Sequence, residues 1–477
     1  MSVNPPPPGP KVSRLQGFML ATRRRDPLAF LLRLARDYGD IAHFQIGSRR
    51  IFLLNHPDYI KDALGGHYDS FSKRHGSGPS KHFLGEGLVI SEGDYHRSQR
   101  RLIQPAFHRR HVAGHAALMV EHAARWRERW SHGQRVDVAR EMRLLTLEIM
   151  SRLLFGVESE AEAEEIGEAV TLIFTQFRPF GMPLARLLNA LPHARRVERA
   201  KSRLDAIIYR RIAERRAGAR GGADLLGMLL EMEGEGGPLT DTQVRDEVLT
   251  LFLAGHESVA NSLMWTWYLV SQHPDVEARL HEEVDAVLGP RLPTADDVPR
   301  LRYTEMVLAE SMRLYPPSWT LARFVTGDWR VGGYILPAGS VVIMSQYTMH
   351  RHPRYFRDPS RFDPERWTPE ARAARPPFTY FPFGGGPRRC IGEGLAWVEG
   401  ILLIATLAQR WGMRLVADHP VVTEPVVTLR PKYGIMMELE RREAARAAAP
   451  RAGNRDAGAE SGGVCPHRLA MHARPGG

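Results

Sequence analysis

Apolar and polar positions change their spacing several times along this chain, and each change predicts a different kind of element. A helical spacing over Leu28–Tyr38 gives way to two short alternating runs, Ile41–Ile46 and Arg50–Leu54, with a Gly-Ser pair between them as in a hairpin. From about Ser91 to Gly289 the spacing is almost entirely helical. We therefore expect a mainly helical fold with a minor sheet component.

The last third of the chain returns to short strands, predicted at Phe324–Val331 and Ser340–Ser345, and ends with a helix after Cys390. Prolines and glycines interrupt the helical part, because proline cannot continue a helix and glycine weakens one. These breaks fall at Pro105, Gly133, Pro179–Pro183, Pro192 and Gly234–Pro238.

The longest predicted helix opens at Thr240, where Thr240 and Gln243 form a capping-box pattern, and closes before Pro274. At about 1.5 Å per residue, roughly 32 residues make a rod of about 48 Å. Apolar residues cover most of its faces, so we expect it to be buried. Polar groups nevertheless occur inside it, in the run from Ala254 to Ser258, and burying them requires a functional or structural reason.

The chain has 477 residues, of which 43% are hydrophobic and 25% are charged, enough to bury a large core. Residues 11–440 contain no linker and no repeat, so we interpret them as one domain. Residues 1–10 form a proline-rich segment without an apolar run, which predicts no transmembrane anchor. Residues 441–477 have the composition of a disordered basic tail. Two cysteines in so long a chain exclude a disulfide framework and predict a reducing, cytoplasmic location.

The formal net charge of +11 raises the question of nucleic-acid binding. The arginines are spread along the predicted helices, and no helix-turn-helix, zinc-finger or aromatic RNA-binding signature accompanies them. A basic surface that docks an acidic protein partner is the interpretation we prefer.

Cys390 lies in a glycine-rich loop that runs into an apolar helical pattern. A helix N-terminus and the neighbouring Arg388 and Arg389 would stabilise a thiolate, which could then bind a metal or act as a nucleophile. Gly386 and Gly392 allow the backbone to approach the sulfur closely. The alternatives are a buried structural cysteine or an anion-binding loop, although the Gly-Lys-Ser/Thr of a phosphate loop is missing.

This loop resembles the haem-binding loop of cytochromes P450, whose pattern is Phe-x-x-Gly-x-Arg-x-Cys-x-Gly. The resemblance implies the cytochrome P450 fold, with haem b as cofactor and Cys390 as the thiolate ligand of its iron. It also implies that the long helix crosses the distal face of the haem and that the helix after the loop is proximal. The matching positions, all expected to bind the cofactor, are Phe383, Gly386, Arg388, Cys390 and Gly392.

The family's distal helix carries the pattern Ala/Gly-Gly-x-Asp/Glu-Thr, which resembles the stretch from Ala254 to Ser258. By this resemblance Glu257 and Ser258 are catalytic and pass protons toward dioxygen. Serine keeps the hydroxyl of the usual threonine but lacks the methyl group that restricts its rotamer, and the effect on coupling stays open. A helix kink with a solvent-facing Glu-Ser pair is the structural alternative. A zinc-protease motif beginning at His256 is excluded, because position 260 is alanine.

Two further signatures imply structural and propionate-binding residues. Glu310, Arg313 and Arg366 match the family's buried Glu-Arg-Arg cluster on the thiolate side. His96, Arg100 and Arg323, together with Arg388, are the expected donors to the haem propionates, although His96 alone could also be a surface histidine. By family position the expected substrate contacts are Phe83, Leu88, Phe177, Leu253, Ala254, Trp319 and Leu321.

This apolar set favours a hydrophobic substrate such as a fatty acid or terpenoid, although such residues also form cores. The resemblance implies a monooxygenase that inserts one atom of dioxygen into that substrate. We expect a monomer that receives electrons from a separate ferredoxin or flavodoxin and an NAD(P)H-dependent reductase, because no such domain is fused. The alternatives are a peroxygenase that uses hydrogen peroxide, or a haem-binding protein without turnover. Substrate identity and the role of the tail with Cys465 stay open.

Overall fold

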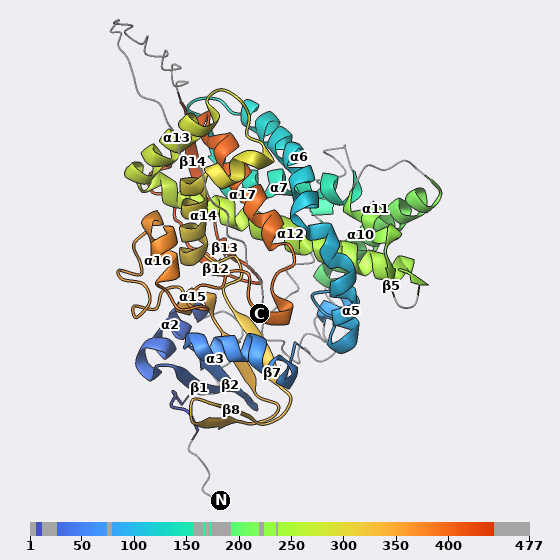
Figure 1. Cartoon of the computed structure of the whole chain (residues 1–477), viewed down its shortest axis with the longest axis vertical. Coiled ribbons are helices and arrows are strands. Elements are labelled where there is room, and N and C mark those ends of the chain that lie inside the picture. Colours follow the sequence, from blue (N-terminus) through green and yellow to red (C-terminus); the bar gives the residue numbers. More distant parts are fainter. Residues whose placement is uncertain are drawn as a thin grey trace, which may run out of the picture. The chain divides into compact units, whose positions relative to one another are not determined.

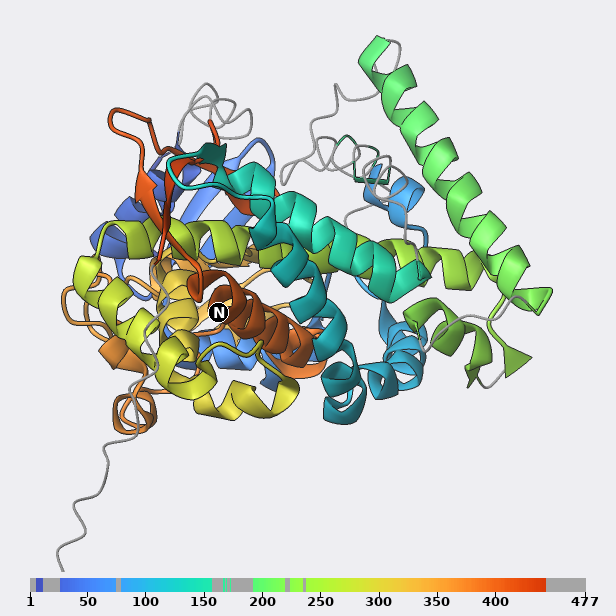
Figure 2. The same cartoon turned by 90° about the horizontal axis from the view of Figure 1, so that it is seen from above.

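Helix α12 (Asp241–Ser271) runs through the helical part of the molecule, and most of its residues are buried (Figure 1). Thr240 caps its N-terminus, and both bonds of the predicted capping box with Gln243 are present. The helix ends at Ser271, three residues before Pro274. Seen from above, α7 (Val138–Phe155) and α12 lie side by side over most of the length of α7 (Figure 2). The predicted start and end of the longest helix are therefore confirmed.

The computed structural model describes residues 6–11, 26–73, 79–156, 166–167, 169, 172, 192–218, 224–234 and 237–442. The remaining helices pack mainly around α12 or border the sheets. They are α2 (Pro27–Tyr38), α3 (Pro57–Lys61), α4 (Pro79–Leu84), α5 (Gly93–Ile103), α6 (Arg109–Glu128), α10 (Pro192–Arg216), α11 (Leu225–Glu231), α13 (Pro274–Leu288), α14 (Arg302–Leu314), α15 (Gln346–Met349), α16 (Pro369–Ala373) and α17 (Glu393–Ala408). Among the described helices, none is long and apolar enough to span a lipid bilayer.

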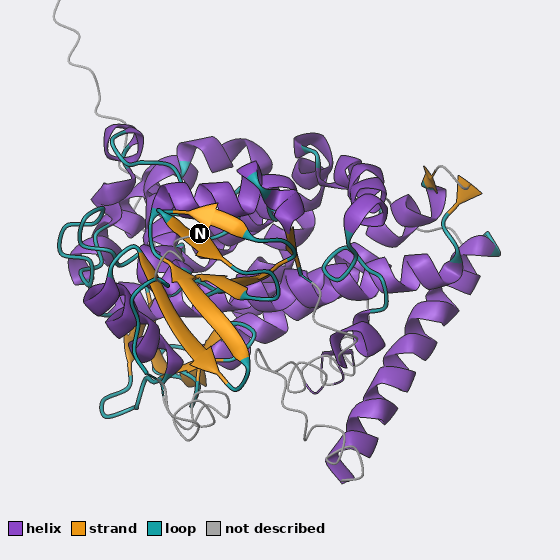
Figure 3. Cartoon of the chain, turned by 90° about the horizontal axis from the view of Figure 1, so that it is seen from below, coloured by secondary structure: helices purple, strands orange, loops and turns teal. Residues whose placement is uncertain are grey.

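The largest sheet has five strands in the order β1-β2-β10-β7-β3, and it lies to one side of the helices (Figure 3). Its strands are β1 (Ile41–Ile46), β2 (Arg49–Leu54), β3 (Phe71–Ser72), β7 (Leu321–Val325) and β10 (Val341–Met344). All neighbours are antiparallel except β2 and β10. Alternate residues of β2 enter different clusters, with Phe52 and Leu54 on one face and Ile51 and Leu53 on the other. The sheet is thus buried on both faces.

The second sheet has the strand order β11-β14-β4, and the other strands form hairpins. These strands are β4 (Arg135–Asp137), β5 (Glu233–Gly234), β6 (Gly237–Pro238), β8 (Trp329–Val331), β9 (Tyr334–Leu336), β11 (Trp411–Leu415), β12 (Thr423–Pro425), β13 (Leu429–Pro431) and β14 (Met436–Arg441).

The predicted N-terminal helix and hairpin are confirmed by α2, β1 and β2. Two predictions about strands were wrong. The run Phe324–Val331 is not one strand, because it belongs to β7 and β8, which lie in different sheets. The chain also does not end with the helix after Cys390, because β11 to β14 follow α17. Strands as short as β8, β12 and β13, with three residues each, carry too few positions for alternation to stand out in the sequence. The predicted break at Pro179–Pro183 lies outside the described residues.

Candidate active site

Cys390 lies between a short helical turn, Gly386–Arg388, and the first residue of α17, and its side chain is exposed. The Cys390 backbone N–H donates to the Phe383 carbonyl oxygen over 2.9 Å, which closes the loop. Gly386 has φ +65°, and a Cβ there would overlap the carbonyl oxygen of Leu64. Only glycine suits this position, because other residues are strained at such φ and the neighbour is rigid backbone.

The charged surroundings of the thiol differ in part from the expectation. The surrounding protein atoms desolvate the Cys390 thiol even though its side chain is accessible, and this desolvation raises its pKa more than the hydrogen bond from the Gly392 N–H and the charges of Arg100 and Arg389 lower it. Arg389 is engaged instead with Glu393, over 2.5 and 2.7 Å. The Gly392 N–H and the charges of Arg100 and Arg389 do favour the thiolate, as expected, but desolvation opposes them. A bound metal ion would offset the desolvation, because a coordinating thiol is deprotonated by the metal's own charge.

Basic side chains converge beside this loop, and several are buried. His96 is 2% exposed, and burial followed by the charge of Arg388 lowers its pKa to about 3. Burial, with the same Arg388, lowers the pKa of Arg323 to about 10. Among the described residues, neither Nδ1 of His96 nor Nη1 of Arg388 has a hydrogen-bond partner. Buried donors without acceptors, gathered around positive charge, fit the two carboxylates of a haem.

Lys73 belongs to the same cluster, and sequence reasoning missed it. Burial and the charges of Arg323 and Arg388 lower its pKa to about 7. Its backbone N–H donates to Oε1 of Glu92 over 2.6 Å, and Arg388 donates to the same oxygen over 3.3 Å. Lys73 follows β3, whose Ser72 pairs with the residue after Arg323 in β7. This register brings Lys73 close to Arg323. The pairing of β3 with β7 cannot be read from the sequence alone, so Lys73 was not predicted.

Arg100 and Phe383 complete the surroundings of the thiol. Burial lowers the pKa of Arg100, while the charge of Cys390 opposes that change, so the guanidinium and the sulfur lie within electrostatic reach. The Phe383 ring packs with its centroid 5.7 Å from that of Trp397 in α17. Gly392 places its N–H on the sulfur and leaves room for Phe107 nearby.

Glu310, Arg313 and Arg366 meet in one buried cluster, as expected. Arg313 binds both carboxylate oxygens of Glu310, over 2.7 and 2.8 Å, and both side chains are fully buried. Nε of Arg366 lies 3.3 Å from Oε1 of Glu310, and the Trp367 indole donates to Oε2 over 2.9 Å. The remaining donors of Arg313 reach the carbonyl oxygens of His350, Pro359 and Arg361. This network joins α14 to the segment before α16.

Near the middle of α12, Ala254 is exposed although Leu251, Phe252 and Leu253 before it are buried. The Ser258 hydroxyl donates to the Ala254 carbonyl oxygen over 2.7 Å. The Glu257 carboxylate accepts a 2.6 Å hydrogen bond from Oγ1 of Thr428. The predicted catalytic pair therefore lies one turn beyond an exposed position of the helix, and the acid has a partner that the sequence did not reveal.

The expected substrate contacts fall into two groups. Phe83, Leu88 and Leu253 are buried, whereas Ala254 is exposed and Leu321 is half-buried. Trp319 is 3% exposed, packs in the cluster between α2 and the sheet, and donates its indole N–H to the Val426 carbonyl oxygen over 3.0 Å. Phe177 lies outside the described residues.

The loop that carries Leu88 is fastened to α12. The Glu86 N–H donates to Asp246 over 2.8 Å, and the Leu88 N–H donates to Glu247 over 3.0 Å. A Cβ on Gly87 would lie 2.6 Å from the Asp246 carbonyl oxygen and would overlap Oγ1 of Thr250. The close approach of loop and helix thus depends on glycine at this position.

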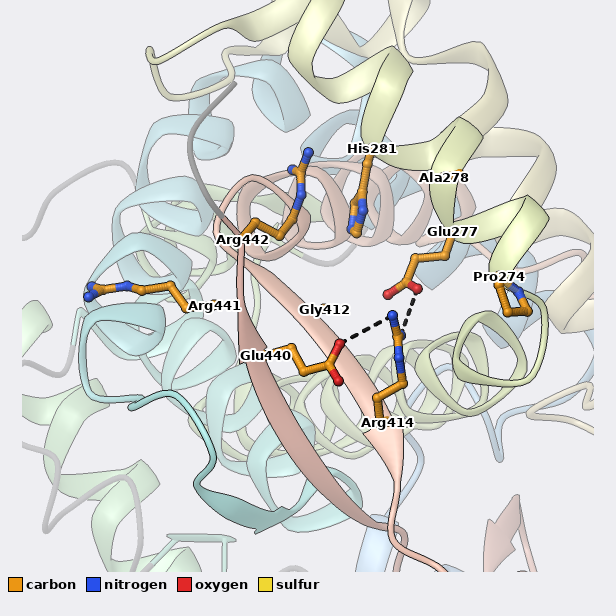
Figure 4. A pocket seen from close by; sticks show the side chains of 9 residues that line it. All are labelled: Pro274, Glu277, Ala278, His281, Gly412, Arg414, Glu440, Arg441 and Arg442. Atoms are coloured by element: carbon orange, nitrogen blue, oxygen red, sulfur yellow. Dashed lines mark ion pairs between the residues drawn. The ribbon is translucent and has the colours of Figure 1, made fainter. Parts of the chain in front are cut away.

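A separate cavity of about 340 Å³ lies between α13, β11 and β14 (Figure 4). Arg414 bridges Glu277, over 2.6 Å, and Glu440, over 3.2 Å. Glu277 is buried, and burial raises its pKa even though Arg414 opposes the change. None of the residues lining this cavity belongs to the loop of Cys390 or to α12. We assign the ion pairs to the packing of α13 on the sheet.

Comparison with known proteins places these features in a family. The family model described as Cytochrome P450 matches residues 5–438. Cyclooctatin synthase of Streptomyces melanosporofaciens is 37% identical over 85% of this chain and 89% of its own length. Cyclooctat-9-en-7-ol 5-monooxygenase of the same organism is 36% identical over 84% of this chain and 88% of its own length. Pentalenene oxygenase of Streptomyces avermitilis is 32% identical, over 83% and 89%.

Solved structures agree. The heme domain of cytochrome P450DA, 27% identical, superposes with a TM-score of 0.81 over 93% of this chain and 99% of that one. The structure titled Retinoic acid bound cyanobacterial CYP120A1 is 24% identical and has the same fold. Its TM-score is 0.82 over 92% of this chain and 100% of that one. The chain therefore belongs to the cytochrome P450 family and is a haem-dependent monooxygenase.

Proposed function

We propose that this enzyme oxygenates a terpenoid, with electrons from a separate ferredoxin or flavodoxin and its NAD(P)H-dependent reductase. The observation that carries the proposal is the exposed Ala254, one turn before the Glu257–Ser258 pair on a mostly buried helix. Leu253, the residue before Ala254, is apolar and buried. Apolar walls with few polar groups are typical of sites that bind hydrocarbons. Three relatives whose names specify cyclooctatin, cyclooctat-9-en-7-ol and pentalenene support a terpenoid over a fatty acid.

In this proposal the haem is haem b, held by Cys390 and by the basic cluster of His96, Arg100, Arg323 and Arg388. Covalent attachment of haem through a Cys-x-x-Cys-His motif is excluded, because the two cysteines, Cys390 and Cys465, lie far apart in the sequence. The bound haem supplies the oxidising chemistry and the thiolate tunes its electronics. Extraction of the pigment with acidified acetone should release all of it from the protein.

The chain's own residues bind and orient the haem and pass protons. The Ser258 hydroxyl and the Glu257 carboxylate can exchange protons with water, and a positioned acid typically contributes about 10²–10⁴-fold to a rate. Glu310, Arg313 and Arg366 hold the segment before the cysteine loop and do not react. The basic cluster fixes the orientation of the propionates through charge-assisted hydrogen bonds.

The electron donor docks, in this proposal, on the face where α5 and α6 meet the cysteine loop. Arg101, Arg109 and Arg110 are exposed on these helices. An acidic ferredoxin or flavodoxin would be steered there by charge, and the attraction would weaken with salt. We also propose a monomer and, from the cysteine usage, a cytoplasmic location, with residues 11–440 as one domain between the proline-rich segment and the tail.

A panel of cyclic terpenes and long-chain fatty acids tests the substrate class. A terpene should shift the haem spin state and should gain one oxygen atom when reductase, ferredoxin and NADPH are present. Fatty acids as the only ligands would overturn the terpenoid assignment. Product formed with hydrogen peroxide alone, and none with the electron-transfer chain, would favour the peroxygenase alternative.

A further inference from the structure

The hairpin of β12 and β13 lies next to the proposed proton relay. Pro425 pairs with Leu429, so Val426, Val427 and Thr428 form the tip. The Val426 N–H donates to the Thr428 carbonyl oxygen over 3.0 Å, which closes the tip. Arg430 and Glu424 form an ion pair of 2.9 Å across the two strands.

Two tryptophans and one backbone bond hold this hairpin in place. The Trp319 indole donates to the Val426 carbonyl oxygen over 3.0 Å, and the Trp265 indole donates to that of Leu429 over 2.8 Å. The Leu429 backbone N–H donates to the Pro317 carbonyl oxygen over 2.9 Å. Trp265 is fully buried and stacks on Tyr315, with ring centroids 4.1 Å apart. Such anchors on both sides of the tip fix the position of the Thr428 backbone.

The Thr428 hydroxyl donates to Oε1 of Glu257 over 2.6 Å. An O–H donor this close to a carboxylate is a strong, charge-assisted hydrogen bond. Two other charged or titratable groups interact electrostatically with this carboxylate, Arg143 from α7 and His256 from α12. Arg143 in turn lies near Arg430 of the hairpin. The Glu257 side chain is therefore held by Thr428, a residue of the hairpin and not of its own helix.

We propose that Thr428 is a positioning residue, whose hydroxyl holds the Glu257 side chain against the β12–β13 hairpin until the acid is needed. This inference rests on the proton relay assigned to Glu257 and Ser258 under the proposed function. In this proposal the carboxylate turns between the side on which it collects a proton and the side on which it delivers one. The hydrogen bond to Thr428 must break for that turn, so the hairpin sets how readily the relay operates.

The C–O stretching band of the reduced, carbon-monoxide-bound protein tests this directly, because the band reports charges and donors beside the bound ligand. When Thr428 is intact, Glu257→Gln should leave the band in place, because the hairpin holds the acid away from the bound carbon monoxide. Thr428→Val should produce a shifted band that Glu257→Gln removes in the double variant. The matched control, Thr428→Ser, keeps a hydroxyl and should keep the parent band. An unshifted band in Thr428→Val, or a shifted one that survives Glu257→Gln, would overturn the inference.

The amount of product formed per NADPH gives a second readout. Because the restraint sets how readily the relay operates, Thr428→Val should change the product formed per NADPH, and Thr428→Ser should keep the parent value. An unchanged value in Thr428→Val would count against the inference. If Glu257→Gln leaves the product formed per NADPH unchanged, the relay assignment itself fails, whereas the C–O band still decides whether Thr428 restrains the side chain.

Discussion

Replacement of Arg313 by alanine should destabilise the protein severely. Arg313 makes five hydrogen bonds of 2.7–2.9 Å, two to Glu310 and three to carbonyl oxygens. Its loss leaves a fully buried carboxylate with Arg366 at 3.3 Å and hydrogen bonds from Trp367 and Asp363. Breaking a buried pair costs about 3–5 kcal/mol. A typical stability of about 5–15 kcal/mol would fall by a large fraction.

Guanidinium unfolding followed by tryptophan fluorescence measures this loss, and absorbance measures the haem content. The matched control is Arg372→Ala, because Arg372 pairs over 3.0 Å with Glu305 of the same helix, α14, but both side chains are exposed. That change should cost less than about 1 kcal/mol. Arg313→Ala should also yield little haem-loaded protein. Equal stability and normal haem content in the two variants would refute the reasoning.

Three further variants test other parts of the account. Gly87→Ala should weaken the binding of azole ligands in spectral titrations, because the new Cβ would lie 2.6 Å from a backbone oxygen of α12, whereas Gly114→Ala, with nothing within 4 Å, should not. Burial raises the pKa of Glu399 to about 8, so its neutral form stabilises the fold at low pH and this contribution is lost as pH rises from about 4.5 to 8. Glu399→Gln should therefore gain stability relative to the parent over that range, and a constant difference between unfolding curves at pH 5 and pH 8 would contradict this. Lys73→Met should release haem to apomyoglobin faster than the parent does, and an equal rate would remove Lys73 from the propionate cluster.

The helices and the cysteine loop could be predicted from sequence because their signals are local. The capping box at Thr240 and the break at Pro274 depend only on neighbouring residues, and the structure confirms both. The strands of β11 to β14 were missed because short strands are specified by partners far away in the chain. For example, Met436 pairs with Asp137.

The site shows the same division. Glu310 and Arg313 lie one turn apart on a helix, so their meeting could be expected. Thr428 reaches Glu257 across 171 residues, and Lys73 joins Arg323 only through strand pairing. The bond from the buried Trp319 indole to the hairpin likewise joins residues 107 positions apart in the sequence. The thiol's pKa also depended on desolvation and on the pairing of Arg389 with Glu393, which the sequence does not display.

The absorption spectrum of the reduced, carbon-monoxide-bound protein tests the central claim most directly, namely that Cys390 is the axial thiolate of a bound haem. The account predicts a Soret band shifted strongly to the red in the parent protein and its loss in Cys390→Ser. An ordinary haem spectrum in the parent protein, or a red-shifted band that persists in Cys390→Ser, would contradict it.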